Sequence, residues 1–300
     1  MKNVRSTLAL ATFFVAATLT ACGGSDDAPS TTLTVTPALG AVYGASVTVF
    51  NGTSGATLGT GTTATTGVTA GSASIPLFGS TAGPIVVKVS LDPGTKFFDE
   101  ASMTDITISS ASATTLLTAL PSLPASATKS IGVTPLTNMA ARLAGLTSSG
   151  AVLVTAQQAN EGAARTVLAL GLPTTFNIMA SPIAAKTATF PTDVYGRLLA
   201  EMASRAPDGK NALDQSNVLV SSVSAATSTI SVTSTANLTA VIAAISSAAA
   251  AVNTVKGAGT IAVTPSNLAP AAGVLSSAAS SQNTANSSGN APTGASGGAN

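Results

Sequence analysis

The sequence predicts a multidomain α+β protein, with a small antiparallel β-sandwich at residues 31–118 followed by an all-α helical bundle at residues 131–256. Two patterns lead to this prediction. In the first segment, polar and apolar residues alternate in short runs rich in Thr and Val, as in half-buried strands. In the second, apolar residues recur at helical spacing. Residues 257–300 have low complexity, and we expect disorder from Ser276 to Asn300, because this stretch buries too little apolar surface to offset the entropy of ordering.

Residues 1–21 have the parts of a secretion signal peptide. Lys2 and Arg5 make the start positive, and Leu8 to Leu19 is an apolar run. Its length of about a dozen residues suits a signal core and is shorter than the ~20 residues of a membrane-spanning helix. Cys22 follows directly and is the only cysteine of the chain, so it has no disulfide partner within the chain.

The segment Leu19-Thr20-Ala21-Cys22 resembles the lipobox of bacterial lipoproteins, Leu-[Ala/Ser/Thr]-[Gly/Ala]-Cys. The resemblance implies that Cys22 becomes the first residue after cleavage and is acylated on its sulfur and its amine. Several acyl chains would anchor the protein, because each buried CH₂ contributes ~0.8 kcal/mol. Similar lipoproteins with Asp after the cysteine stay at the inner membrane. Gly23 therefore implies the outer membrane, with the protein facing the periplasm or the cell surface.

Residues 22–30 form a predicted tether, because no residue between Gly23 and Ser30 is apolar and larger than Ala or Pro. Strands are then expected at alternating runs separated by turn signals such as Asn51-Gly52 and Asp92-Pro93-Gly94. Turns at a spacing of ~8–12 residues are typical of an antiparallel sandwich. The alternating runs are Thr32–Thr36, Ala45–Phe50, Ile85–Leu91 and Asp105–Ser109.

Part of this segment resembles the carboxypeptidase-regulatory, prealbumin-like module, an Ig-like β-sandwich. The resemblance is carried by Ala45–Phe50, Gly55–Gly59, Ile85–Val89 and Phe97–Glu100. It implies a scaffold or binding domain without catalytic residues of its own.

Pro121 and Pro124 mark a predicted linker at residues 119–130, with a last short strand around Ile131 and Val133. Helices are expected where capping residues precede an apolar stripe. They begin at Thr134-Pro135, at Thr155 with Gln158 in a capping box, at Thr192 or Asp193, at Ala212 and near Asn237.

The helical segment resembles a pattern in predicted surface lipoproteins of Gram-negative bacteria, in which a β-sandwich precedes a helical domain. The matching residues are Val133–Thr137, Ala159-Asn160, Leu170–Leu172 and the Tyr195–Ala203 helix. This resemblance implies an architecture and a location but no activity.

Charge and composition exclude several functions. Cleavage would remove Lys2 and Arg5 from the 12 basic residues, leaving 10 against 11 acidic residues, so no basic surface is expected to bind nucleic acid. The chain has no histidine, which excludes Ser-His-Asp and Cys-His catalysis and most zinc sites. The residues after the signal contain no apolar run long enough for a transmembrane helix.

Two kinds of site remain as alternatives to turns, caps and a solvated lysine. Ser126 and Lys129 have the Ser-x-x-Lys spacing of a serine hydrolase dyad, but they lie in the linker, and Lys186-Thr187-Ala188 lacks the glycine of a Lys-Thr-Gly motif. Oxygen ligands for Ca²⁺ occur in two clusters. The first holds Asp92, Asp99, Glu100 and Asp105, and the second holds Asp208, Gly209, Asn211 and Asp214.

We therefore expect a lipid-anchored, non-enzymatic scaffold without a cofactor, which binds the membrane through Cys22 and has a protein or polysaccharide partner. An accessory lipoprotein of an envelope assembly or transport system is the first alternative. An enzyme with a Ser126–Lys129 dyad is the second.

Overall fold

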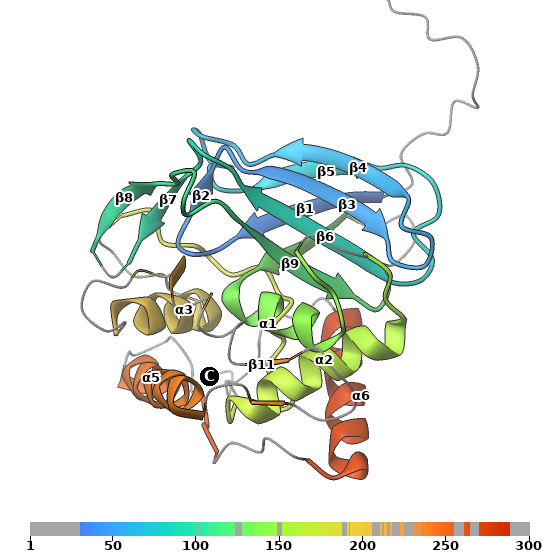
Figure 1. The fold of residues 1–300 in the computed structure, drawn as a ribbon, viewed down its shortest axis with the longest axis vertical. Coiled ribbons are helices and arrows are strands. Elements are labelled where there is room, and N and C mark those ends of the chain that lie inside the picture. Colours follow the sequence, from blue (N-terminus) through green and yellow to red (C-terminus); the bar gives the residue numbers. More distant parts are fainter. Residues whose placement is uncertain are drawn as a thin grey trace, which may run out of the picture.

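The computed structural model has a mixed α+β fold, with strands at one end of the molecule and helices at the other (Figure 1). It describes residues 31–100, 102–123, 128–148, 152–187, 191, 193–205, 211, 213–214, 217, 223–224, 231–232, 235–254, 261–264 and 270–288. Cys22, the tether and Ser126 lie outside these residues. None of the helices in the described ranges is long and apolar enough to cross a membrane.

The largest sheet is antiparallel and has the order β4-β3-β6-β9. Its strands are β3 (Ser46–Asn51), β4 (Thr57–Thr62), β6 (Ile85–Leu91) and β9 (Thr114–Leu120). The alternating runs predicted β3 within one residue at each end and β6 with its exact bounds, but they did not predict β4 or β9. Val47 pairs with Val89 and Val49 with Val87, and all four side chains point into the core.

A second sheet has the order β10-β1-β5 and joins distant parts of the chain. Its strands are β1 (Thr31–Pro37), β5 (Ala73–Leu77) and β10 (Thr128–Val133). β1 is antiparallel to β5 and parallel to β10, with Val35 opposite Ile131. Residues 128–130 of the expected linker are thus part of a strand. The expected short strand around Ile131 and Val133 is the second half of β10, and its first half was missed because residues 128–130 are polar.

A third, smaller sheet has the order β2-β7-β8. It consists of β2 (Val42–Tyr43), β7 (Lys96–Asp99) and β8 (Thr104–Thr107). The two-stranded pair β11 (Val223–Ser224) and β12 (Ser231–Val232) lies among the helices in sequence.

Three of the helices begin at the predicted caps, a fourth begins two residues before the expected Asn237, and the last was not predicted. The helices are α1 (Pro135–Leu143), α2 (Ala156–Ala169), α3 (Val194–Ser204), α5 (Thr235–Thr254) and α6 (Ala272–Ser288). Thr134 and Thr155 each form a capping box, and the Asp193 carboxylate accepts a hydrogen bond from the Gly196 amide. The helix expected from Ala212 to Val223 falls largely on residues outside the described ranges.

The prediction of a separate all-α bundle was wrong. α1 lies against β9, where the Leu117 amide donates to the Asn138 side-chain oxygen at 3.1 Å. β9 is apolar on both faces: Leu116 points into the core between the sheets, whereas Leu117 packs against the helices. The helices therefore bury their apolar stripes on the sheet as well as on one another, and one cluster of buried side chains extends from β1 to α5.

Tyr195 links three parts of the helical region. Its hydroxyl group donates to the Ile178 carbonyl at 2.7 Å and lies 2.7 Å from the Thr134 hydroxyl at the start of α1. The ring meets Phe176 edge to face, with 5.4 Å between the centroids. Complete burial raises the pKa of Tyr195, so the phenol stays neutral.

The structure does not have the disorder expected from Ser276 at residues 276–288, which belong to α6. Residues 289–300 lie outside the described part of the chain. One side of α6 is buried at Ala278, Gln282 and Asn286, which are four residues apart. Figure 1 shows α6 beside α2, at the end of the molecule away from most of the strands.

Candidate functional site

The predicted lipid attachment site, Cys22, lies outside the described residues, as does Ser126. Lys129 is described, and its ammonium group donates to the backbone and side-chain oxygens of Asn286 at 2.7 and 3.0 Å. Burial lowers the pKa of Lys129. Its contacts in the described residues therefore give this lysine a structural role at the C-terminal end of α6, where the helix carbonyls attract a positive charge.

The acidic residues proposed for Ca²⁺ do not come together. Asp92 and Asp105 are exposed, whereas Asp99 and Glu100 are buried. Within the described ranges, no three acidic, cysteine or histidine side chains gather closely enough to hold a metal ion. In the second cluster, Asn211 and Asp214 bond each other's backbone amides, and Asp208 and Gly209 lie outside the described residues.

Glu100 is the most perturbed carboxyl group among the described residues. It is 2 % exposed and borders a cavity of about 10 Å³ between the β-region and α3. Burial, with a smaller contribution from neighbouring Asp99, raises its pKa to about 8, although amide groups of Glu100 and Gly40 oppose the shift. The cavity is lined mainly by apolar side chains, and its volume is at the lower limit for a single water molecule.

A concave site lies between α2 and α6, and we call it the α2–α6 groove. Its volume is about 590 Å³, within the range of ~300–1,000 Å³ for small-molecule sites. It is lined by Gln157, Asn160, Glu161, Arg165, Pro270, Ala272, Leu275, Ser276, Ala279, Ser280 and Asn283.

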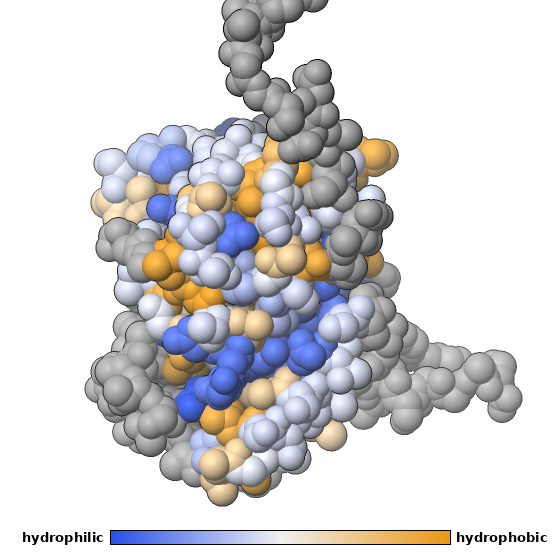
Figure 2. Space-filling view, turned by 90° about the vertical axis from the view of Figure 1, so that its right-hand side faces the viewer, coloured by the Kyte–Doolittle hydropathy of each residue, from blue (hydrophilic) through white to orange (hydrophobic). Residues whose placement is uncertain are grey.

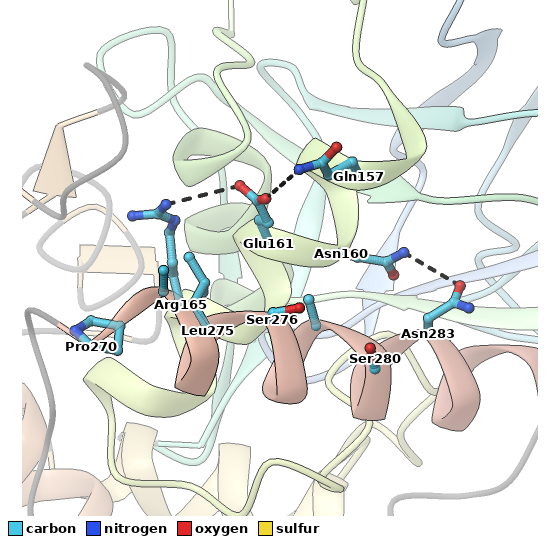
Figure 3. Close-up of a pocket in the computed structure, with 11 residues that line it drawn as sticks. Gln157, Asn160, Glu161, Arg165, Pro270, Leu275, Ser276, Ser280 and Asn283 are labelled. Carbon is cyan, nitrogen blue, oxygen red and sulfur yellow. Dashed lines mark hydrogen bonds and ion pairs between the residues drawn. The ribbon is translucent and has the colours of Figure 1, made fainter.

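Polar side chains of α2 form one wall of the α2–α6 groove (Figure 3). Gln157, Glu161 and Arg165 follow one another at intervals of four residues, so they lie on one face of the helix. The Gln157 amide donates to one oxygen of Glu161 at 2.8 Å, and an Arg165 nitrogen lies 3.9 Å from the other oxygen. Arg165 is only 6 % exposed, whereas the Glu161 side chain is 32 % exposed.

The wall from α6 carries hydroxyl and amide groups together with Leu275 and Ala279. One hydrogen bond crosses the groove, in which the Asn160 amide donates to the Asn283 oxygen at 3.3 Å. Figure 2 views the molecule from the side on which Figure 1 places α2 and α6, and a hydrophilic band crosses this face below the strands.

Hydrogen bonds outside the groove hold α6 in place. The Gln282 amide donates to the carbonyls of Thr174 and Phe176 at 2.7 and 2.9 Å. The Asn177 amide donates to the Ala285 carbonyl at 3.0 Å. Together with the Lys129 contacts to Asn286, these bonds place the groove's second wall without using the residues that line it.

The sequence prediction did not find this groove. The four-residue spacing of Gln157, Glu161 and Arg165 was a readable signal for a polar helix face. The opposite wall carried no such signal, because α6 lies in a stretch expected to be disordered.

No protein-family model matches the chain, and no curated protein or solved structure is significantly similar to it.

Proposed function

We propose that the protein is a membrane-anchored extracytoplasmic lipoprotein that acts as a non-catalytic scaffold or binding protein, with Cys22 as its lipid attachment site. The observation that carries the proposal is the order of basic start, apolar run and Leu19-Thr20-Ala21-Cys22. A prealbumin-like sandwich module remains part of this proposal.

The position of the folded region is compatible with such an anchor. β1 begins at Thr31, and residues 22–30 would separate it from the acyl chains. Nine extended residues span at most ~30 Å, so the β-region would lie close to the membrane surface. The non-catalytic part of the proposal is supported by the lack of histidine and by the structural contacts of Lys129.

Cys22→Ser tests the anchor. The variant is expected to lose incorporation of labelled palmitate and to leave the membrane fraction, whereas Ser25→Ala in the tether should behave as the wild type. Recovery of Cys22→Ser in membranes after washing with high salt and carbonate would refute the proposal.

Gly23→Asp tests the assignment to the outer membrane. If the residue after Cys22 directs sorting, this variant remains acylated but moves to the inner-membrane fraction. An unchanged distribution between the two membranes would refute the outer-membrane assignment while leaving the anchor intact.

A further inference from the structure

We infer that one end of the β-region contacts the bilayer directly, through the exposed side chains of Phe78 and Leu153. The partner is the lipid surface itself, which apolar side chains enter at the boundary between headgroups and acyl chains. This inference rests on the proposed lipid anchor at Cys22 and adds an orientation of the fold at the membrane.

Phe78 lies at the end of the β-region where the chain enters its first strand, which we call the tether end. Thr31 begins β1 and pairs with Leu77, the last residue of β5, so Phe78 follows directly. The Phe78 amide donates to the Leu58 carbonyl near the start of β4 at 2.8 Å. Phe78 is 51 % exposed, so the end of β5 presents an aromatic ring beside the start of β1.

Leu153 lies at the same end and is 55 % exposed. The next residue, Val154, donates its amide to the Gly52 carbonyl at 2.8 Å, in the turn between β3 and β4. The loop after β5 contacts the same turn, because the Asn51 side-chain amide donates to the Ser80 carbonyl at 3.2 Å. Both exposed apolar side chains therefore belong to segments that contact one turn.

The loops of the tether end suit an uncharged interface. They join β3 to β4, β5 to β6 and β9 to β10, at residues 52–56, 78–84 and 121–127. The sequences of these loops contain no Asp, Glu, Lys or Arg. Such loops can approach acyl chains without the cost of removing a charge from water.

The opposite end of the β-region differs in charge. Asp92 follows the last residue of β6 and is exposed, as are Lys96 in β7 and Asp105 in β8. Figure 1 places β7 and β8 on the left and the ends of β3 and β9 on the right. The right-hand side faces the viewer in Figure 2, which shows hydrophobic areas over the strands.

The anchor determines which partner the tether end meets. Residues 22–30 span at most ~30 Å when extended, and the opposite end of the β-region lies a further ~20 Å away along the strands. A short tether holds the tether end at the bilayer at an effective concentration on the order of millimolar. Two apolar side chains are then enough to favour one orientation, whereas a free protein would need a larger apolar patch to bind.

Tryptophan fluorescence in vesicles tests the inference, because the chain has no tryptophan. Acylated, full-length Phe78→Trp and Leu153→Trp are placed in phosphatidylcholine vesicles, in which bromine atoms near the top of the acyl chains quench nearby tryptophan. Val68→Trp is the matched control, since Val68 is 98 % exposed in the loop between β4 and β5 at the opposite end. Lipid quenching of the first two variants should exceed that of the control by roughly twofold or more, because interfacial side chains reach the upper acyl chains.

A charge at the tether end should weaken the contact. Adding Leu153→Asp to Phe78→Trp should lower its quenching toward that of the control, because an ionised carboxylate is costly to remove from water. Adding Val68→Asp to Phe78→Trp should leave the quenching unchanged. Circular dichroism verifies folding, which substitutions at these exposed positions should preserve.

Equal quenching of the three tryptophan variants would overturn the inference, and so would unchanged quenching after Leu153→Asp. Tryptophan that is shielded from aqueous acrylamide but not quenched by lipid would also overturn it and would indicate a second copy of the chain at this end. Flotation of the vesicles separates these failures from failure of the anchor. Protein that floats without lipid quenching keeps the anchor and lacks the contact, whereas protein that does not float refutes the anchor and the contact with it.

Discussion

Glu100→Gln should make the protein more stable at pH 8 and should remove part of its pH dependence. The wild-type carboxyl group is 2 % exposed and borders a cavity of about 10 Å³, at the lower limit for a single water molecule. Apolar side chains of α3 line the cavity at Leu199, Met202 and Ala203. An ionised Glu100 would therefore exchange bulk water for an apolar surrounding with neighbouring Asp99 nearby, whereas glutamine resembles the neutral acid in shape and stays uncharged.

The size of the effect follows from the pKa of Glu100, which burial raises from 4.5 to about 8. Between these values the unfolded chain has released a proton that the folded protein keeps. The contribution of the neutral Glu100 carboxyl group to the free energy of unfolding is thus complete below pH 4.5, falls as the pH rises and is lost above pH 8. At about 1.36 kcal/mol per pKa unit, the total is about 5 kcal/mol. Local detachment of α3 could relieve the charge at a lower cost, so we expect a measured difference of about 2 to 5 kcal/mol.

Urea unfolding at pH 5 and pH 8 provides the assay, followed by far-UV circular dichroism because the chain has no tryptophan. Wild type and Glu100→Gln should differ little at pH 5, and the variant should be the more stable protein at pH 8. Glu161→Gln retains Glu100 and should keep the wild-type slope. Parallel pH profiles for wild type and Glu100→Gln, or a variant that is less stable at pH 8, would refute the reasoning.

Two further substitutions test the packing of the helices. Tyr195→Phe removes the hydroxyl group that donates to the buried Ile178 carbonyl. It should lower the free energy of unfolding by about 2 kcal/mol and the melting temperature by roughly 4–8 °C. The control Tyr43→Phe, at a partly exposed position, should change the free energy of unfolding by less than about 0.5 kcal/mol. Equal shifts for the two tyrosines would contradict the role of the buried bond. Gly162→Ala places a methyl group against the backbone of α1 and should destabilise the protein by about 1–3 kcal/mol. The control Gly273→Ala, in open space on α6, should be neutral or stabilising. Thermal melts compare the two variants, and an unchanged melting temperature for Gly162→Ala would show that α1 and α2 are not in close contact.

Local features of the chain were predictable. The capping residues Thr134 and Thr155 predicted the starts of α1 and α2, because an N-cap bond joins residues only three positions apart. Alternation predicted β6 with its correct bounds for a similarly local reason, since residues two positions apart in a strand lie on the same face of the sheet.

The arrangement of the helices was not predictable from these patterns. In β9, the neighbours Leu116 and Leu117 are both buried, which indicates burial of both faces but does not identify what covers the second face. The parallel pairing of β1 with β10 joins residues almost a hundred positions apart. Such contacts depend on the whole fold, and so the sequence prediction separated helices that share a core with the strands.

The groove illustrates a different difficulty. α6 is rich in Ser, Ala and Asn, and it buries two polar side chains, Gln282 and Asn286. Its position depends on hydrogen bonds to Thr174, Phe176 and Lys129, which lie more than a hundred residues away in the chain. A composition-based argument counts apolar surface and therefore misses a helix held largely by polar bonds.

The polar face of α2 departs from the usual pattern of helix packing. Helix positions that face another helix are usually apolar, since this buries the most surface. Here Gln157, Glu161 and Arg165 occupy the face beside α6, in a chain of which only 8 % is charged. Apolar residues at these positions would let the helices close the groove and bury more surface. Residues that stabilise the fold less than the alternatives are expected mainly at functional sites. In this part of the molecule, such residues occur at the charge pair of Glu161 and Arg165 in the α2–α6 groove.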